Sequence, residues 1–361
     1  MIDSAAKAHA RARASALTDR FTAAGASPVE AAILQPADVL LDLYGEDIRA
    51  RAYTTTDPLR GEMMLRPDFT VPVVRMHMAS GAETPARYTY SGEVFRKQED
   101  DDTRAVEYLQ TGFELFGTGA RADEDAEVFA LIASAVADQN VTPVIGDMGL
   151  LRAAIDGLST TPARKAALLR HIWRPRRFRR LIERFTGKLT PPPGRTALLA
   201  EADPLARFDA IPGLRTRAEI ETRLATLRED AQTPPIAALE AEVLDAVLAL
   251  RAAAPDAVSA LRDLAVDLPG LTPAVDQLAA RLEALAGHGI AVETLAFDAA
   301  LGRASMEYYD GFVFAFHGPD PAQPPLATGG RYDALTYALG GGAALSAVGG
   351  MIRPDLMEDP A

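Results

Sequence analysis

Polar side chains occur at fixed offsets within the apolar, strand-like runs of residues 64–117. They supply two carboxylates, a hydroxyl, an amide and a guanidinium: Asp68, Thr70, Arg96, Gln110 and Glu114. A few such groups among apolar residues are typical of a pocket that holds a small polar ligand. Gln110 and Glu114 lie four apart on one expected strand, so they point to the same face, as a shared ligand requires. A solvated sheet face would have the same pattern.

Two later stretches, residues 306–316 and 327–335, are expected to complete the pocket. They supply phenol groups and a glycine pair: Tyr308, Tyr309, Gly329, Gly330 and Tyr332. Neighbouring residues of a strand point to opposite faces, so we expect one of the two adjacent tyrosines to line the pocket. The glycine pair also suits a simple turn, and Asp68, which follows a proline, also suits a turn or helix cap.

Composition narrows the class of protein. The chain has 361 residues, 48% of them apolar, which is enough for one large domain or two ordinary ones. A formal net charge of −13 argues against broad electrostatic binding to nucleic acid. There is no cysteine, which excludes disulfides and zinc–thiolate sites, and His171 and His317 are isolated, so we expect no metal and no cofactor. No apolar run reaches the ~20 residues that span a bilayer and no secretory signal is recognisable, so we expect a cytoplasmic protein.

Hydrophobic periodicity and turn residues give a coarse order of elements. We expect helices over residues 4–24, 37–44, 124–139, 148–158 and 331–339. We expect strands up to Leu34 with a break at Pro36, in a hairpin over 53–70, and over 87–97, 107–117, 141–147, 290–297, 306–316 and 344–352. Residues 71–81 suit either a helix or a strand. Phe312, Phe314 and Phe316 share one strand face, which predicts burial against helices.

Between Pro162 and Gly289 the strand signals vanish, and alanine, leucine and arginine dominate. This predicts an α+β protein in which an antiparallel sheet is interrupted by a helical insertion. The expected division is a discontinuous core of residues 1–160 and 290–361 and an inserted helical lobe of residues 161–289.

At this point the motifs resemble a known family. LRPDFT, FR with a glutamine fourteen residues after the arginine, FELFG, YYDGFVF and GGRYD occur in the order and spacing of the catalytic core of histidyl-tRNA synthetase. The resemblance covers roughly residues 30–160 and 290–353, and it implies the class II synthetase-like fold. It also implies that Pro36 matches the proline of the first class II motif, which lies at the dimer interface.

The resemblance implies which residues surround the histidine substrate. Carried over one by one, they are Asp68, Thr70, Gln110, Glu114, Tyr308, Tyr309 and Tyr332, with Gly329 and Gly330 as pocket backbone. The chemistry is consistent, because carboxylates pair with an α-ammonium while amide and phenol groups hydrogen-bond an imidazole.

The sequence departs from the family at the positions that bind ATP. Arg96 stands where the second class II motif has its ATP-binding arginine, and we interpret it as a relic of that site. The following positions hold Gln98 and then four consecutive carboxylates, residues 99–102, which would repel a polyphosphate. Arg303 comes too early to match the catalytic arginine that precedes the tyrosine pair. The arginine that stacks on adenine would fall at Leu356, and we expect no anticodon-binding domain.

This selective loss resembles the regulatory subunits of ATP phosphoribosyltransferase, which are paralogues of histidyl-tRNA synthetase. The resemblance implies a subunit without catalytic residues of its own that acts in histidine biosynthesis. It would bind L-histidine, activate the short-form catalytic subunit and convey histidine feedback, as a dimer within a hetero-octamer. The alternative is a truncated but active enzyme that forms a histidyl adenylate.

A basic cluster contrasts with the acidic whole: residues 164–184 hold nine lysines and arginines against one acid. A solvated helical face is the usual explanation. Docking of an acidic partner ranks above binding of RNA, which would be steeply salt-dependent. Neither nucleic acid nor a membrane is expected as a partner.

Overall fold

A nine-stranded sheet forms the centre of the computed structural model, which describes residues 4–38, 51–98, 104–206, 213–303 and 308–358. Both halves of the chain contribute strands, and β7 from the first half lies between β10 and β9 from the second, so neither half could form the sheet alone. The order is β1 (Ser27–Pro28), β5 (Ala86–Phe95), β6 (Glu107–Phe116), β12 (Ala347–Ile352), β11 (Ala327–Arg331), β10 (Phe312–His317), β7 (Thr142–Asp147), β9 (Ala296–Asp298) and β8 (Arg251–Ala253). In the described part of the chain, no helix is long and apolar enough to cross a membrane.

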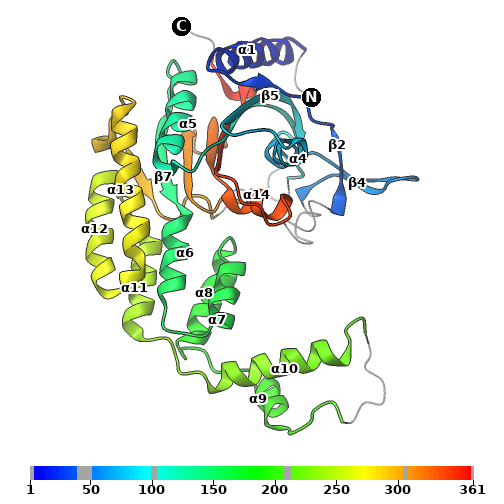
Figure 1. Cartoon of the computed structure of the whole chain (residues 1–361), viewed down its shortest axis with the longest axis vertical. Coiled ribbons are helices and arrows are strands. Elements are labelled where there is room, and N and C mark those ends of the chain that lie inside the picture. Colours follow the sequence, from blue (N-terminus) through cyan, green and yellow to red (C-terminus); the bar gives the residue numbers. More distant parts are fainter. Residues whose placement is uncertain (1–3, 39–50, 99–103, 207–212, 304–307, 359–361) are drawn as a thin grey trace.

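Helices cover one face of this sheet (Figure 1). They are α1 (Ser4–Ala23), α5 (Arg121–Ala135) and α13 (Thr272–Gly287). The phenylalanines of β10 point toward this layer, and the rings of Phe314 and Phe316 lie 5.3 and 5.2 Å from that of Phe129 on α5. The predicted burial of this aromatic face against helices is therefore confirmed.

On the other face, α4 (Thr70–Ser80) and α14 (Asp333–Leu339) pack against each other. Beside α4 lies a small sheet of β2 (Leu34–Pro36), β4 (Gly61–Leu65) and β3 (Thr54–Asp57). The predicted hairpin is present, and its turn is closed by Asp57 Oδ1, which accepts hydrogen bonds from the backbone of Leu59 and Arg60 at 2.8 Å each. Pro36 ends the edge strand β2, as expected of a residue that cannot donate to the ladder.

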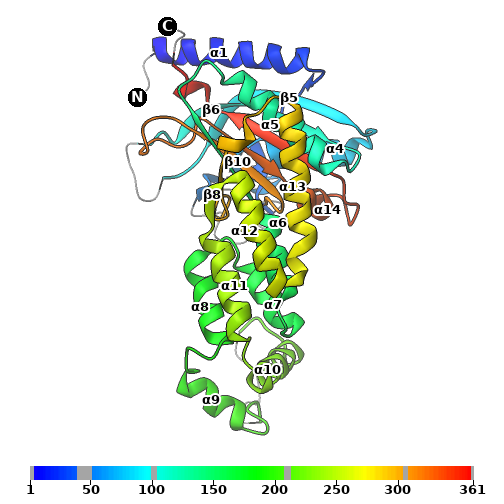
Figure 2. The same ribbon diagram turned by 90° about the vertical axis from the view of Figure 1, so that its left-hand side faces the viewer.

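The remaining helices extend away from the sheet to the end of the molecule opposite α1 (Figures 1 and 2). They are α6 (Met148–Gly157), α7 (Pro162–Arg170), α8 (Pro175–Phe185), α9 (Pro193–Ala200), α10 (Arg217–Gln232), α11 (Ala238–Ala249) and α12 (Ala254–Asp267). Short 3₁₀ turns lie at Pro269–Leu271, Val292–Thr294 and Pro354–Leu356. The division into a core and an inserted lobe stays a prediction, with β8 in the main sheet and α13 packed on α5.

Several expectations need correction. The sheet is mixed, because β1 pairs with β5 and β7 with β9 in parallel. Residues 290–297 contain a 3₁₀ turn where β-branched residues had indicated a strand, and only β9 reaches β7. The strand expected from residue 306 begins at Phe312, and the glycine pair lies within β11 and not at a turn. Residues 37 and 38 are helical, and the rest of the helix expected over 37–44 lies outside the described residues.

Candidate ligand-binding site

A cavity of about 620 Å³ opens on the sheet face opposite α5. Its volume lies in the range usual for small-molecule sites. Of the predicted pocket residues, the structure brings seven to its wall: Asp68, Thr70, Arg96, Gln110, Glu114, Tyr308 and Tyr309. These come from the loop before α4 and its first residue, from the residue after β5, from β6, and from the segment before β10, so three parts of the chain distant in sequence converge here.

Glu114 is the hydrogen-bonding centre of the cavity. Its Oε1 accepts from Thr70 at 2.9 Å and from the Tyr90 hydroxyl at 3.2 Å, and its Oε2 accepts from the Tyr332 hydroxyl at 2.5 Å. Burial raises the pKa of Glu114 to about 7, although the hydrogen bonds from Tyr332, Thr70 and Tyr90 act to lower it. A carboxylate that titrates near neutrality responds to any charge placed beside it.

Glycines on the neighbouring strands make room for this centre. Gly349 faces Glu114 in the ladder between β6 and β12, and a Cβ at that position would lie 1.5 Å from Glu114 Oε2. Gly112 faces Tyr90 across the ladder between β5 and β6, and a Cβ there would lie 2.2 Å from the Tyr90 hydroxyl. Glycine is required at both positions because the side chains occupy the space that a Cβ would take.

Tyr332 reaches Glu114 because its neighbours anchor the end of β11. Arg331 donates to Asp125 Oδ1 at 2.8 Å and to Asp333 Oδ1 at 3.0 Å, and its guanidinium is almost fully buried. Asp333 Oδ1 also accepts from the backbone of Ala347 at 2.8 Å. In the GGRYD stretch, the arginine and the aspartate are therefore structural. The predicted pocket residue Tyr332 is not among the described residues that line the cavity, and it reaches the site through its hydrogen bond to Glu114.

The glycine pair predicted as pocket backbone is not among the described residues that line the cavity. A Cβ on Gly330 would meet the Tyr309 ring at 2.8 Å, so this glycine supports the tyrosine from behind. Gly329 lies on the opposite face of the sheet, where a Cβ would meet the Phe314 ring at 2.2 Å. Both tyrosines of the adjacent pair line the cavity, although only one was expected to, because they precede β10 and are not bound to its alternation.

Three further polar groups of the wall differ in their hydrogen bonding. Arg96 Nε donates to the backbone carbonyl of Pro67 at 2.8 Å and so holds the loop that presents Asp68. Asp68 Oδ1 accepts from the backbone of Val71 at 3.3 Å, so the expected capping contact coexists with a place in the cavity. Gln110 is 1% exposed, and its Nε2 has no hydrogen-bond partner in the described part of the chain.

Sequence reasoning missed part of the wall. Tyr90 lines the cavity and stacks on Phe69 with ring centroids 4.4 Å apart, and its placement opposite Gly112 was the signal that could have identified it. The far wall contains Arg251, which donates to Asp298 at 3.0 Å, together with His317 and Arg353. Among the described residues, no group of three or more histidines and carboxylates has the geometry of a metal site.

Arg303 turns away from the cavity, although its neighbour Gly302 lines it. Arg303 Nε donates to the Ile172 carbonyl at 2.9 Å, and its guanidinium lies over the Phe178 ring of α8 at 5.0 Å. The arginine nearest in sequence to the expected catalytic position is thus engaged by the helices.

The fold and the cavity define a class II aminoacyl-tRNA synthetase-like protein. The family model of histidyl-tRNA synthetase matches residues 2–232 and 210–355. A solved ATP phosphoribosyltransferase regulatory subunit/histidyl-tRNA synthetase from Bacillus halodurans has the same fold, with a TM-score of 0.67 at 21% identity over 97% of this chain and 78% of that one.

Relatives of higher sequence identity show which family within this fold the chain belongs to. An ATP phosphoribosyltransferase regulatory subunit from Mesorhizobium japonicum is 32% identical over 95% of both chains, and one from Brucella anthropi is 33% identical over 91% of this chain and 92% of its own. The chain belongs to the family of ATP phosphoribosyltransferase regulatory subunits. The resemblance predicted from the motifs is thereby confirmed.

Proposed function

We propose that this chain is a non-catalytic regulatory subunit of ATP phosphoribosyltransferase that acts in the cytoplasm in histidine biosynthesis. It binds L-histidine in the cavity around Glu114, activates the short-form catalytic subunit and conveys feedback to it. The observation that carries the proposal is a cavity lined by seven of the predicted pocket residues, combined with an Arg303 that is held by the helices outside it.

The polar and aromatic residues that line the cavity support histidine as the ligand. Asp68 and Glu114 offer carboxylates to an α-ammonium, and charge-assisted hydrogen bonds of this kind are the stronger ones. The unpaired Gln110 Nε2 is a buried donor that a ligand oxygen or ring nitrogen would satisfy. Tyr308 and Tyr309 give the cavity an aromatic wall with hydroxyl groups for an imidazole.

The residues at the positions where the synthetase family binds ATP argue against adenylate chemistry. Adenylate formation needs cationic groups on the phosphates as charge moves to the leaving group. Arg303 donates to a backbone carbonyl and stacks on α8, so it is not directed at a ligand in the cavity. The four carboxylates in sequence after Arg96 would add repulsion.

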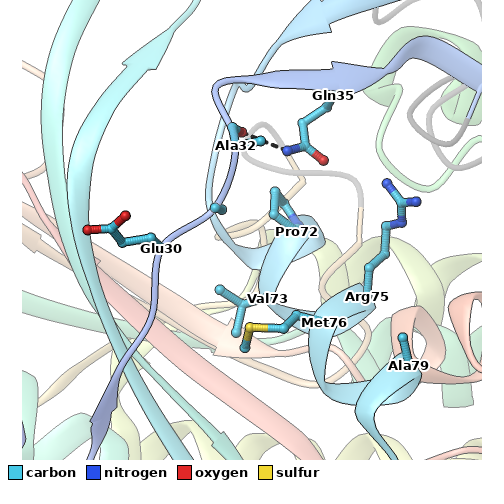
Figure 3. Close-up of a pocket in the computed structure, with 9 residues that line it drawn as sticks. Glu30, Ala32, Gln35, Pro72, Val73, Arg75, Met76 and Ala79 are labelled. Carbon is cyan, nitrogen blue, oxygen red and sulfur yellow. Dashed lines mark hydrogen bonds between the residues drawn. The ribbon is translucent and has the colours of Figure 1, made fainter. Parts of the chain in front are cut away.

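The same proposal includes a homodimer within a hetero-octamer with the catalytic subunit. The edge strand β2 supports self-association, since Ile33 and Leu34 are 45% and 44% exposed next to Pro36. A second cavity, of about 350 Å³, lies between this segment and α4, and Gln35 bonds back to the Ala32 carbonyl at its rim (Figure 3). An apolar edge next to a hollow suits burial against a second copy.

ATP–pyrophosphate exchange tests the non-catalytic part. We expect no histidine-dependent exchange by the purified chain. The second candidate, a truncated enzyme that forms histidyl adenylate, is favoured by Arg96, and Arg251 and Arg353 also line the cavity. If exchange occurs and Arg96→Ala abolishes it, the second candidate is correct; without exchange, Arg96→Ala should leave assembly with the catalytic subunit unchanged.

A further inference from the structure

Helix α8 (Pro175–Phe185) has two opposite faces. Phe178, Ile182 and Phe185 are buried on one of them. The other face carries four exposed arginines: Arg176, Arg177, Arg179 and Arg180. They are spaced three or four apart in overlapping pairs, so their guanidinium groups lie side by side on the helix surface. These four residues are called the α8 basic face below.

The other arginines of this region show what structural pairing looks like. Arg164, Arg184 and Arg195 converge on Asp230, with nitrogen–oxygen distances of 2.6, 3.3 and 2.6 Å. The side chains of the α8 basic face have no ion pair or hydrogen bond with any described residue. Packing of the helices therefore does not need these four charges, and an acidic surface placed against them would relieve their mutual repulsion.

The buried face of the same helix contacts Arg303, the residue that follows the cavity wall in the chain. Arg303 stacks on Phe178 and donates to the carbonyl of Ile172, three residues before α8 begins. The two residues before Arg303, Leu301 and Gly302, line the cavity. One side of α8 is thus in contact with the segment that a bound ligand would touch, while its other side is open.

We propose that the α8 basic face docks an acidic surface of the catalytic partner subunit, and that Arg303 connects this interface to the occupancy of the cavity. The inference rests on the proposed function, since it assigns the surface through which that regulation passes. A folded acidic protein surface fits better than nucleic acid. The chain carries a net charge of −13, and no aromatic side chain is exposed among the four arginines to stack on bases.

Charge reversal tests the interface. The variant Arg176→Glu/Arg180→Glu is compared with Arg20→Glu/Arg262→Glu, which makes the same charge change at exposed positions of α1 and α12. Affinity for the short-form catalytic subunit is measured by sedimentation or calorimetry at low and high salt. We expect the α8 variant to lose at least tenfold in affinity at 50 mM salt and the control to lose less than twofold. The salt dependence of the wild-type interaction should be reduced in the α8 variant.

The results distinguish a wrong docking surface from a wrong proposed function. Equal affinity of all three proteins overturns the docking surface while leaving the proposed function intact, and lack of binding by the wild type overturns both. Salt-sensitive retention of RNA that is lost only in the α8 variant, with unchanged subunit affinity, overturns the protein docking surface in favour of nucleic acid.

A second variant, Arg303→Met, tests the link between the interface and the cavity. It keeps the α8 basic face, so it should still bind the catalytic subunit and should bind histidine with unchanged affinity. The effect of histidine on binding of the catalytic subunit should fall at least threefold; an undiminished effect overturns the role of Arg303.

Discussion

The Tyr332 hydroxyl donates a hydrogen bond to Glu114 Oε2 at 2.5 Å, and both side chains are buried to within 1% exposure. This contact joins β6 from the first half of the chain to the end of β11 from the second half. Of the two residues, Glu114 lines the cavity, so the contact holds a carboxyl with a pKa of about 7 where a ligand would meet it.

Glu114 should make the stability of the free protein pH-dependent. Its pKa is about 7 in the fold against 4.5 in the unfolded chain, so the native state binds its proton more tightly. The resulting stability is fully present below pH 4.5 and is lost as pH rises through 7, by about 3 kcal/mol at most. Glu114→Gln cannot titrate, so the difference in free energy of unfolding between wild type and variant should shift by roughly that amount between pH 4.5 and 8. The free energies of unfolding are measured by urea titration. If the difference between wild type and variant stays constant from pH 4.5 to 8, the assignment is contradicted.

Gln110→Ala and Asp68→Ala should each weaken the binding of L-histidine. Loss of a buried polar partner typically costs ~1–3 kcal/mol, which corresponds to a rise in Kd of roughly five- to 150-fold. Calorimetric titration measures the effect, with Gln232→Ala at an exposed position of α10 as the matched control. Unchanged affinity in both pocket variants, with the fold intact, would show that histidine does not bind in this cavity.

Gly349→Ala should abolish histidine binding with little change in overall secondary structure. The added methyl group would lie 1.5 Å from Glu114 Oε2 and only 2.9 Å from the Phe113 carbonyl, so the carboxyl must leave its place beside Tyr332. Gly341→Ala is unsuitable as a control because its backbone has a φ of +63°, whereas Gly194 has open space. Gly194→Ala should therefore bind histidine like the wild type. Normal binding by Gly349→Ala would show that the carboxyl does not hold the ligand.

Leu34→Asp should dissociate the proposed homodimer. The residue lies on the edge strand β2 and is 44% exposed in the single chain, so a charge there costs little to the monomer but is buried on association. Sedimentation velocity should show a monomer for this variant and a dimer for Val266→Asp, a control at a 78% exposed position of α12. A dimer in both would place the interface elsewhere.

Local patterns in the sequence predicted much of the candidate site. Gln110 and Glu114 share a face because side chains alternate along a strand, and the ladder with β5 keeps that register. The hairpin turn at Asp57 was predictable because its side chain closes the turn within three residues.

Features that depend on distant contacts were not predictable. Strand β8 consists of Arg251–Ala253, has no β-branched residue, and forms only because β9 lies beside it. Nothing near Arg303 in sequence indicates that it turns toward Ile172 and Phe178, more than a hundred residues earlier. The need for glycine at position 349 becomes visible only when the carboxyl of Glu114 is placed opposite it.

Phosphoribosyl transfer measured with the short-form catalytic subunit tests the central claim most directly. The catalytic subunit is assayed alone and with an equimolar amount of this chain, with and without L-histidine. The proposed function predicts that addition of the chain raises the rate at least tenfold and that histidine reduces it again. An unchanged rate, together with histidine-dependent ATP–pyrophosphate exchange by this chain alone, would contradict it.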